Sequence, residues 1–308
     1  MKDNCVLMAE SVTEGHPDKL CDTIADAVLD ACLALDRSAH VACEVMATAG
    51  KIIAAGEITA SRFPDIPAVL CQTVREAGYG GADYEVEVIT HAQSPDIAGA
   101  VDGSGELGAG DQGIVYGYAC EETPELLPLP VVLAHRLTRL LTEARKRNTI
   151  PGIRPDGKAE VAIEYRNGRP KRVAAVVVSC QHEEEMELPE LRRAVVRHII
   201  EPAFRDFPLD DETKILINPS GRFVEGGFEA DTGLTGRKLM VDTYGRSAVR
   251  QRWYQGRPQR RLYGPVHCQE HRGGRGGQAL HGQSGVCHCK GPAGGGGCGY
   301  AWHRDLSG

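Results

Sequence analysis

The sequence predicts an α/β (α+β) protein built from repeated units, each a sheet with helices over one face. Apolar residues at helical spacing alternate with β-leaning runs, and turns at Ala49-Gly50 and Asn167-Gly168 separate paired runs. The same order of elements returns after roughly 115 to 120 residues, which indicates an internal repeat. The 308 residues suffice for roughly two domains or more.

The first unit begins with a predicted helix from His16 to Asp36, where apolar residues recur at steps of three or four. Ser11 and Glu14 have the spacing of a capping box at its start. The next predicted elements are a hairpin of His40–Thr48 and Lys51–Thr59, a helix at Asp65–Tyr79 and a strand at Tyr84–Gln93.

The second unit repeats this order. Its predicted elements are a helix at Leu129–Asn148, a hairpin at Lys158–Cys180, a helix at Leu188–Phe204 and a strand at Lys214–Asn218. Helices over one sheet face leave the other face uncovered, so we expect the units to pack sheet against sheet or onto another subunit. Between the units, residues 94–113 carry six glycines without hydrophobic periodicity, which favours a flexible loop that gates a site.

Charge and cysteine usage narrow the class of protein. Residues 1–245 hold 25 Lys and Arg against 40 Asp and Glu, which argues against a nucleic-acid partner. No basic segment leads into an apolar run and no stretch of about 18 apolar residues occurs, so we predict no membrane contact and a cytoplasmic location. Seven cysteines before residue 246 are scattered singly, as is typical of buried reduced thiols.

Two polar clusters are candidates for a site. Residues 14–19 place a carboxylate, an imidazole and an ammonium at the start of a helix, where backbone amides favour anions. Residues 218–238 combine glycines with Asp231, Arg237 and Lys238. Taken alone, the first is either a phosphate and metal site or an ordinary charged first turn. The second is either a ligand loop or a series of turns, because no Walker motif or GxGxxG follows a strand.

Four motifs in order carry a resemblance to a known family: GHPDK at 15–19, GAGDQG at 108–113, INPSGRFVEGG at 217–227 and GLTGRK at 233–238. Together they resemble the S-adenosylmethionine synthetase family over residues 1–245. The resemblance implies three similar units about a pseudo-threefold axis, with the third truncated in this chain. It also implies a homodimer or homotetramer with active sites at the interfaces.

The activity implied by the resemblance is S-adenosylmethionine synthesis from ATP and L-methionine, with Mg²⁺ and K⁺ as cofactors. A neutral thioether sulfur displaces triphosphate, which is then hydrolysed to phosphate and diphosphate. No general base is needed, and charge grows on the leaving group, so electrostatic stabilisation should dominate.

The resemblance also assigns residues by motif. The catalytic set is His16, Lys158, Arg237 and Lys238. The ATP set is His16, Asp111, Asp156, Lys158, Phe223, Asp231, Arg237 and Lys238. The methionine set is Glu57, Gln93 and Asp231, with Asp18 for magnesium and Glu44 for potassium. Without the resemblance, Glu57, Asp156 and Lys158 are read as solvated charges and Phe223 as a core aromatic residue.

The expected domains are residues 1–97, a flexible gating loop at 98–113, a central domain at 114–227 and the start of a third domain at 228–245.

Residues 246–308 differ from the rest of the chain in composition. They hold 15 glycines, 9 arginines and almost no aliphatic periodicity, which is typical of disorder. Codons compatible with residues 262–274, read one nucleotide later, spell Tyr-Met-Ala-Arg-Tyr-Ile-Ala-Lys-Asn-Ile-Val-Ala, which resembles the family's next helix. We therefore predict that this tail is frameshifted and that the chain as written is weak or inactive.

Two rival functions remain open. One is a non-catalytic ATP-binding or regulatory subunit of the same family, which would bind nucleotide without turnover. The other is a nucleic-acid binder acting through the basic tail, which the acidic body disfavours. Cysteines and a histidine in the tail, at 268, 287–289 and 298, do not have the spacing of a zinc finger.

Overall fold

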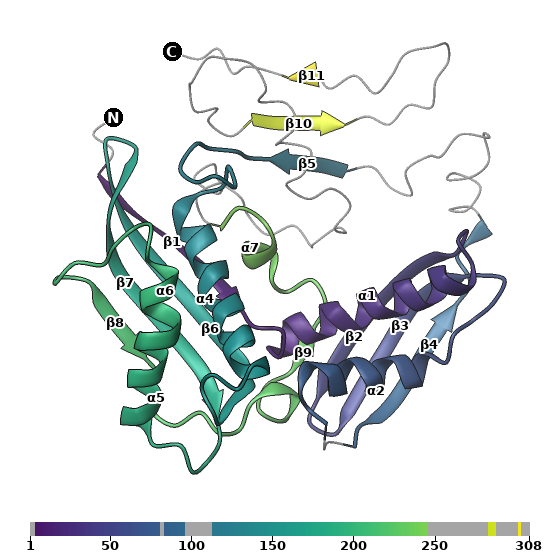
Figure 1. The fold of residues 1–308 in the computed structure, drawn as a ribbon. Coiled ribbons are helices and arrows are strands. Elements are labelled where there is room, and N and C mark those ends of the chain that lie inside the picture. Colours follow the sequence, from purple (N-terminus) through teal and green to yellow (C-terminus); the bar gives the residue numbers. More distant parts are fainter. Residues whose placement is uncertain (1–3, 81–82, 96–112, 246–282, 288–300, 303–308) are drawn as a thin grey trace.

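Two four-stranded sheets, each covered by helices, form the body of the protein (Figure 1). The computed structural model describes residues 4–80, 83–95, 113–245, 283–287 and 301–302. The strand order is β4-β3-β2-β9 in the first sheet and β1-β6-β7-β8 in the second. The predicted class of repeated sheet-and-helix units is therefore confirmed.

The first unit has its helices on one face of its sheet. Its core contains Leu20, Ile24 and Val28 from α1 and Val45 and Ile52 from the sheet, all with no exposed surface. The elements are α1 (Pro17–Leu35), the hairpin β2 (His40–Thr48) and β3 (Lys51–Thr59), α2 (Ile66–Ala77), and β4 (Glu85–His91), which pairs parallel to β3.

The second unit has the same topology. Its core joins Leu133 and Leu137 of α4 to Val161, Val176 and Ile163 of the sheet. The elements are α4 (Leu129–Lys146), the hairpin β6 (Ile153–Arg166) and β7 (Arg169–His182), α5 (Leu188–Val195), a π-helical turn (Val196–Ile200), α6 (Glu201–Ala203), and β8 (Lys214–Ile217), which pairs parallel to β7.

Each sheet is completed by a strand from elsewhere in the chain. The edge strand β1 (Cys5–Val12) precedes the first unit in sequence but pairs antiparallel with β6 of the second. The short strand β9 (Gly233–Leu234) follows the second unit but pairs antiparallel with β2 of the first. The units in space therefore differ from the predicted boundaries, because residues 5–12 lie in the second sheet and residues 233–234 lie in the first.

The start of the first helix differs from the prediction. His16 caps α1, and its Nδ1 accepts a hydrogen bond from the Asp18 amide at 3.2 Å. Ser11 lies in β1, where its hydroxyl bonds to His135 (3.0 Å) and Thr138 (2.9 Å) of α4. The capping box of Ser11 and Glu14 is therefore wrong, because β1 continues through Ser11 and places its side chain against the second unit.

Residues beyond the second unit add short elements. They are a 3₁₀ turn η2 (Gly227–Glu229), β9, and α7 (Leu239–Asp242). A small sheet joins β5 (Gly113–Gly117) to β10 (Gln283–Cys287) and β11 (Ala301–Trp302), so seven residues of the tail are placed as strands. The rest of the predicted frameshifted tail and most of the predicted gating loop lie outside the described residues.

The seven cysteines before residue 246 are free thiols, and four of them, Cys21, Cys32, Cys120 and Cys180, are buried. The predicted burial is therefore found for four of the seven, whereas Cys5, Cys43 and Cys71 are partly buried. Within the described residues, no helix combines the length and apolar character needed to cross a membrane.

The two units meet at the turn that precedes α1. The Tyr79 hydroxyl donates to the Gly15 carbonyl at 2.8 Å, and the Thr13 hydroxyl donates to the Pro155 carbonyl at 2.7 Å. A Cβ atom on Gly15 would lie 2.3 Å from Pro155 Cβ and 2.6 Å from its carbonyl carbon. Only glycine therefore allows the turn to approach β6 this closely.

We expect Gly15→Ala to lower the free energy of unfolding by about 1–3 kcal/mol, because the added methyl group meets backbone atoms that cannot rotate away. Gly80→Ala is the matched control, since a Cβ there meets nothing within 4 Å. Denaturant titration of both variants measures the difference. Equal unfolding midpoints would mean that the turn can move away from β6.

Candidate active site

The N-terminus of α1 forms the centre of the candidate site. Pro17 occupies the first turn, where a residue without an N–H loses no helical hydrogen bond, and the acidic Asp18 complements the positive end of the helix dipole. Asp18 is nevertheless only 1% exposed. A carboxylate buried this deeply needs charged or hydrogen-bonding partners.

Those partners come from β9 and the segment that follows it. Lys238 Nζ lies 2.7 Å from Asp18 Oδ2, Arg237 Nε lies 3.3 Å from Oδ1, and the Leu234 amide donates to Oδ1 at 3.0 Å. The Asp18 carboxylate is thus held by an ammonium, a guanidinium and a backbone amide. These contacts join the GHPDK and GLTGRK motifs, which lie about 220 residues apart.

The sequence analysis missed Asp22. This buried residue lies one turn beyond Asp18 on α1, and its Oδ1 accepts a hydrogen bond from the Gly236 amide at 3.0 Å. The sequence contained a signal, because carboxylates four residues apart lie on the same face of a helix. Both aspartates therefore hold the segment 233–238 against α1.

His16 is neutral in this site. Burial, followed by the charge of Lys238, lowers the pKa of His16 to about 4, against the opposing effects of Asp18 and Asp231. Because Nδ1 accepts a hydrogen bond from the Asp18 amide, the single imidazole proton resides on Nε2. His16 can therefore donate one hydrogen bond to an anionic oxygen without carrying charge.

Asp156, at the start of β6, faces the same cluster. Its Oδ2 accepts a hydrogen bond from the Gly227 amide at 2.9 Å, and the residue is 7% exposed. Burial raises the pKa of Asp156 to about 6, although the Gly227 and Gly157 amides act in the opposite direction. Asp231 raises this pKa further, and Lys238 lowers it.

Lys158 lies two residues further along β6. Its Nζ contacts Glu10 at 2.6 Å and Glu160 at 2.8 Å. Burial acts against the charged form, but hydrogen bonds to both glutamates raise the pKa of Lys158. The structure thus groups seven of the predicted residues around one centre: His16, Asp18, Asp156, Lys158, Asp231, Arg237 and Lys238.

Two predicted methionine contacts lie apart from this centre. On β3, Glu57 Oε1 lies 3.4 Å from His91 Nε2. The backbone amide of Gln93 donates a hydrogen bond to the Thr59 hydroxyl at 3.0 Å. Glu57 is opposite Ala42 on β2, whereas β9 pairs with β2 at Met46 and Ala47. Four residues along a strand span about 13 Å, so the Glu57 side chain is too far from β9 of the same chain to contact it.

Glu44 and Phe223, two further predicted residues, lie at the edges of the site. Glu44 on β2 accepts a hydrogen bond from the Thr235 hydroxyl, and Thr235 also bonds to the backbone of Val45. Phe223 is partly buried, and its amide donates to His182 Nε2 at 3.1 Å. Asp111, predicted to contact ATP, lies outside the described residues.

The described residues contain no group of three or more His, Cys, Asp and Glu side chains that could hold a metal ion. Asp18 is the buried carboxylate nearest to the cationic side chains. A single carboxylate together with substrate phosphates is one usual way in which proteins bind Mg²⁺. The carboxylate of Asp18 therefore suits a magnesium ion only if phosphate groups supply most of the other ligands of that ion.

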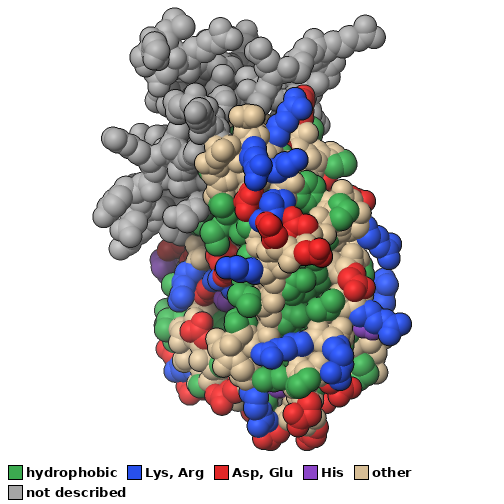
Figure 2. All heavy atoms as spheres, turned by 90° about the vertical axis from the view of Figure 1, so that its left-hand side faces the viewer, with side chains coloured by type: hydrophobic (Ala, Val, Ile, Leu, Met, Phe, Trp, Pro, Cys, Tyr) green, Lys and Arg blue, Asp and Glu red, His purple; other side chains and the backbone are tan. Residues whose placement is uncertain are grey.

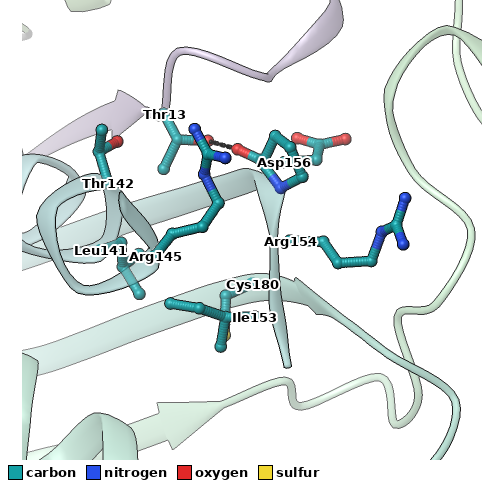
Figure 3. A pocket seen from close by; sticks show the side chains of 9 residues that line it. Thr13, Leu141, Thr142, Arg145, Ile153, Arg154, Asp156 and Cys180 are labelled. Carbon is teal, nitrogen blue, oxygen red and sulfur yellow. Dashed lines mark hydrogen bonds between the residues drawn. The ribbon is translucent and has the colours of Figure 1, made fainter. Parts of the chain in front are cut away.

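A small pocket lies behind Asp156, between β6 and α4. Its volume of about 10 Å³ is roughly that of one water molecule, so it does not hold a nucleotide. Figure 3 shows Thr13, Arg145 and Asp156 around it, with the Thr13 hydroxyl bonded to the Pro155 carbonyl. Arg145 and Lys146 both pair with Glu14, which fixes the end of α4 against the GHPDK turn.

The fold and the cluster define an α/β protein of two sheet-and-helix units with cations and carboxylates gathered at a helix N-terminus. Comparison with known families identifies it further. Residues 4–98 match the S-adenosylmethionine synthetase N-terminal domain, and residues 106–223 match the S-adenosylmethionine synthetase central domain. The chain belongs to the S-adenosylmethionine synthetase family.

Individual relatives agree with this family. The S-adenosylmethionine synthases of two Thermus thermophilus strains are each 50% identical over 260 residues, covering 78% of this chain and 66% of the relative. The S-adenosylmethionine synthase of Desulforudis audaxviator is 48% identical over 255 residues, covering 77% of this chain and 65% of the relative. The chain thus spans just under two thirds of the length of these relatives.

We expect Asp18→Asn to lower the free energy of unfolding by on the order of 3 kcal/mol, because it leaves Lys238 without its charge partner. Asp30→Asn, on the exposed side of the same helix, is the control and should change it by less than about 0.5 kcal/mol. Urea titration at pH 7 compares the two. A loss no greater than that of the control would show that the ion pair does not hold the segment 233–238 in place.

We expect Asp156→Asn to stabilise the fold at pH 7–8 by up to about 2 kcal/mol. The pKa of Asp156 is raised from 3.8 to about 6, so the stabilising neutral form is present at low pH and is lost as pH rises through 6. Asparagine keeps the neutral form at every pH. Unfolding midpoints from pH 4 to 8 should converge at the acidic end, and the exposed Asp211→Asn should show no such trend.

Proposed function

We propose that this chain carries the ATP- and methionine-binding part of an enzyme that makes S-adenosylmethionine. The observation that supports this most directly is the convergence of three separate sequence segments at the N-terminus of α1. They supply His16 and Asp18, Asp156 and Lys158, and Asp231 to Lys238. The relatives at 48–50% identity carry the name of that activity.

In the proposed reaction, a lone pair of the methionine sulfur forms a bond to the 5′ carbon of ATP. The bond from that carbon to the leaving oxygen breaks, and its electrons leave with the triphosphate, which is then hydrolysed to phosphate and diphosphate. The sulfur carries no proton, so the site needs no general base. Its task is to stabilise negative charge on the triphosphate.

The cluster suits that task. Lys158, Arg237 and Lys238 supply positive charge, and the N-terminus of α1 adds the positive end of its helix dipole. The neutral His16 offers Nε2–H to the leaving oxygen. Further proposed contacts are Asp111 and Asp156 to ATP, Phe223 to the adenine, Asp231 to ATP and methionine, and Glu57 and Gln93 to methionine.

We propose Mg²⁺ and K⁺ as the cofactors, with Asp18 as a magnesium ligand and Glu44 as part of the potassium site. Bound magnesium would neutralise phosphate charge. Glu44 and Thr235 offer carboxylate and hydroxyl oxygens, which suit a hard cation such as K⁺.

A second copy of the chain is proposed to complete the site, in a homodimer or homotetramer. The sheet faces opposite the helices carry exposed apolar residues, among them Met46 (44%), Ile89 (54%) and Val6 (52%). Figure 2, seen from the side of the second unit, shows hydrophobic side chains gathered among charged ones. The distance of Glu57 from the cluster of its own chain supports a site shared between two copies.

A non-catalytic ATP-binding subunit is the second candidate. It is favoured by residues 246–308, which, despite their 15 glycines, lack the glycine-rich segment with phosphate-binding lysines that the family resemblance implies after Gly245. We keep the frameshift of this tail as a proposal, and with it a weak or inactive chain as written. The buried thiols support a cytoplasmic location for either function.

The test compares this chain with a frame-restored version. We expect S-adenosylmethionine to form from ATP, methionine, Mg²⁺ and K⁺ in the restored chain alone, because only that chain has the full set of phosphate-binding cations. Chromatography of the product measures the reaction. Lys238→Met in the restored chain should reduce kcat by about 10²–10³, and Lys171→Met, on the exposed end of β7, is its control.

Activity in neither chain would contradict the proposed reaction. ATP binding by calorimetry without turnover in both chains would favour the non-catalytic subunit. Equal activity in both chains would contradict the proposal that the tail is defective.

A further inference from the structure

Gln181 and His182, the last two residues of β7, are polar side chains that the reaction above does not use. They are 3% and 0% exposed, respectively. Buried polar groups cost free energy unless their hydrogen bonds are satisfied, so their partners indicate what they do. All of the partners lie on the strand and loop that border the candidate site, or on the neighbouring backbone.

Gln181 joins the start of β6 to the loop at 223–227. Its Oε1 accepts a hydrogen bond from the Asp156 amide at 3.3 Å, and its Nε2 donates to the Val224 carbonyl at 3.0 Å. A Cβ on Gly226 would lie 2.7 Å from Gln181 Cδ, so the loop packs directly on this amide. One side chain therefore sets the distance between Asp156 and the loop.

His182 holds the next point of the loop. Its backbone amide donates to the Phe223 carbonyl at 2.9 Å, and its Nε2 accepts from the Phe223 amide at 3.1 Å. Its Nδ1 lies 2.8 Å from the Glu183 carbonyl, which can only accept. These two backbone partners require a neutral imidazole with its proton on Nδ1.

The loop is fixed at its far end as well. The Gly227 amide donates to Asp156 Oδ2 at 2.9 Å, and the next residue, Phe228, is 1% exposed and packs edge-to-face on Tyr84 with ring centres 5.8 Å apart. The loop is thus attached to His182, Gln181 and Asp156 in turn. Displacement of the Phe223 backbone or withdrawal of Asp156 would break at least one of these bonds.

We propose that Gln181 and His182 are positioning residues that hold the loop 223–227 and Asp156 in one arrangement for the nucleotide. They act through Phe223 and Asp156 and do not touch the substrate. This inference deepens the proposed function, because it rests on Phe223 and Asp156 as ATP contacts.

The test uses the full chain with Gln181→Met and His182→Leu, which keep volume and remove the hydrogen bonds. His182→Gln is the conservative variant, since its amide oxygen can accept from the Phe223 amide. Arg222→Ala is the control, because Arg222 is exposed next to this loop and, within the described part of the chain, its side chain bonds to Glu184 alone. Hydrogen exchange of the amides at 223–227 and calorimetric binding of Mg-ATP are measured for each.

We expect exchange at 223–227 to accelerate about tenfold or more in Gln181→Met and His182→Leu, with no change in peptides from β2 and β3. Mg-ATP affinity should fall about tenfold, as the loss of an ordering hydrogen bond predicts, and His182→Gln should recover most of both. Arg222→Ala should match the unmodified chain.

Unchanged exchange in both variants would overturn the proposal. Faster exchange with undiminished Mg-ATP affinity would overturn the positioning role and leave only a structural one. Faster exchange in a chain that never binds Mg-ATP would support the attachment of the loop but sink the proposed function, so the two failures are distinguishable.

Discussion

The buried carboxylate of Asp18 is the interaction on which the site depends. It brings Lys238 and Arg237 to the N-terminus of α1. It also accepts a hydrogen bond from the backbone amide of Leu234, which lies in β9. Without this anchor, the GLTGRK motif would still be held by the two-residue strand β9, by Asp22 and by the bonds of Thr235 to Glu44 and Val45, but its cations would have no buried partner of opposite charge among these contacts. Isolated cations would repel one another, whereas a buried anion makes their approach favourable. Charge pairing thus assembles the site and also closes the first sheet.

The exchange of strands makes the two units interdependent. Each sheet ends in a strand taken from a distant part of the sequence, β1 in one case and β9 in the other. The turn between β1 and α1 connects the sheet of the second unit to the first helix of the first unit, and His16 lies in this turn. The close contact of Gly15 with Pro155 holds the turn in place. The candidate site therefore lies at the junction of the two units, and each unit contributes residues to it.

The sequence predicted the repeating elements well, because each has a local signal. Helical spacing located α1 and α4, and Asn167-Gly168 located the turn between β6 and β7. The prediction missed β1, since an edge strand is specified by its partner β6 and not by its own pattern. The same limit applies to Gln181 and His182, whose roles depend on a loop that follows them by some 40 residues. Family resemblance supplied most of the site residues, and the i, i+4 spacing of Asp18 and Asp22 was the local signal that went unused.

The position of β9 has a consequence for synthesis on the ribosome. At the edge of the first sheet, strand β2 pairs with β9. Val45 and Thr235, which are hydrogen-bonded there, lie 190 residues apart in the chain. During translation, the edge of the first sheet therefore stays open until residues near 235 have emerged. An open edge with apolar neighbours invites pairing with other nascent chains. The first sheet is therefore exposed to such pairing for most of the time that the first 245 residues take to appear.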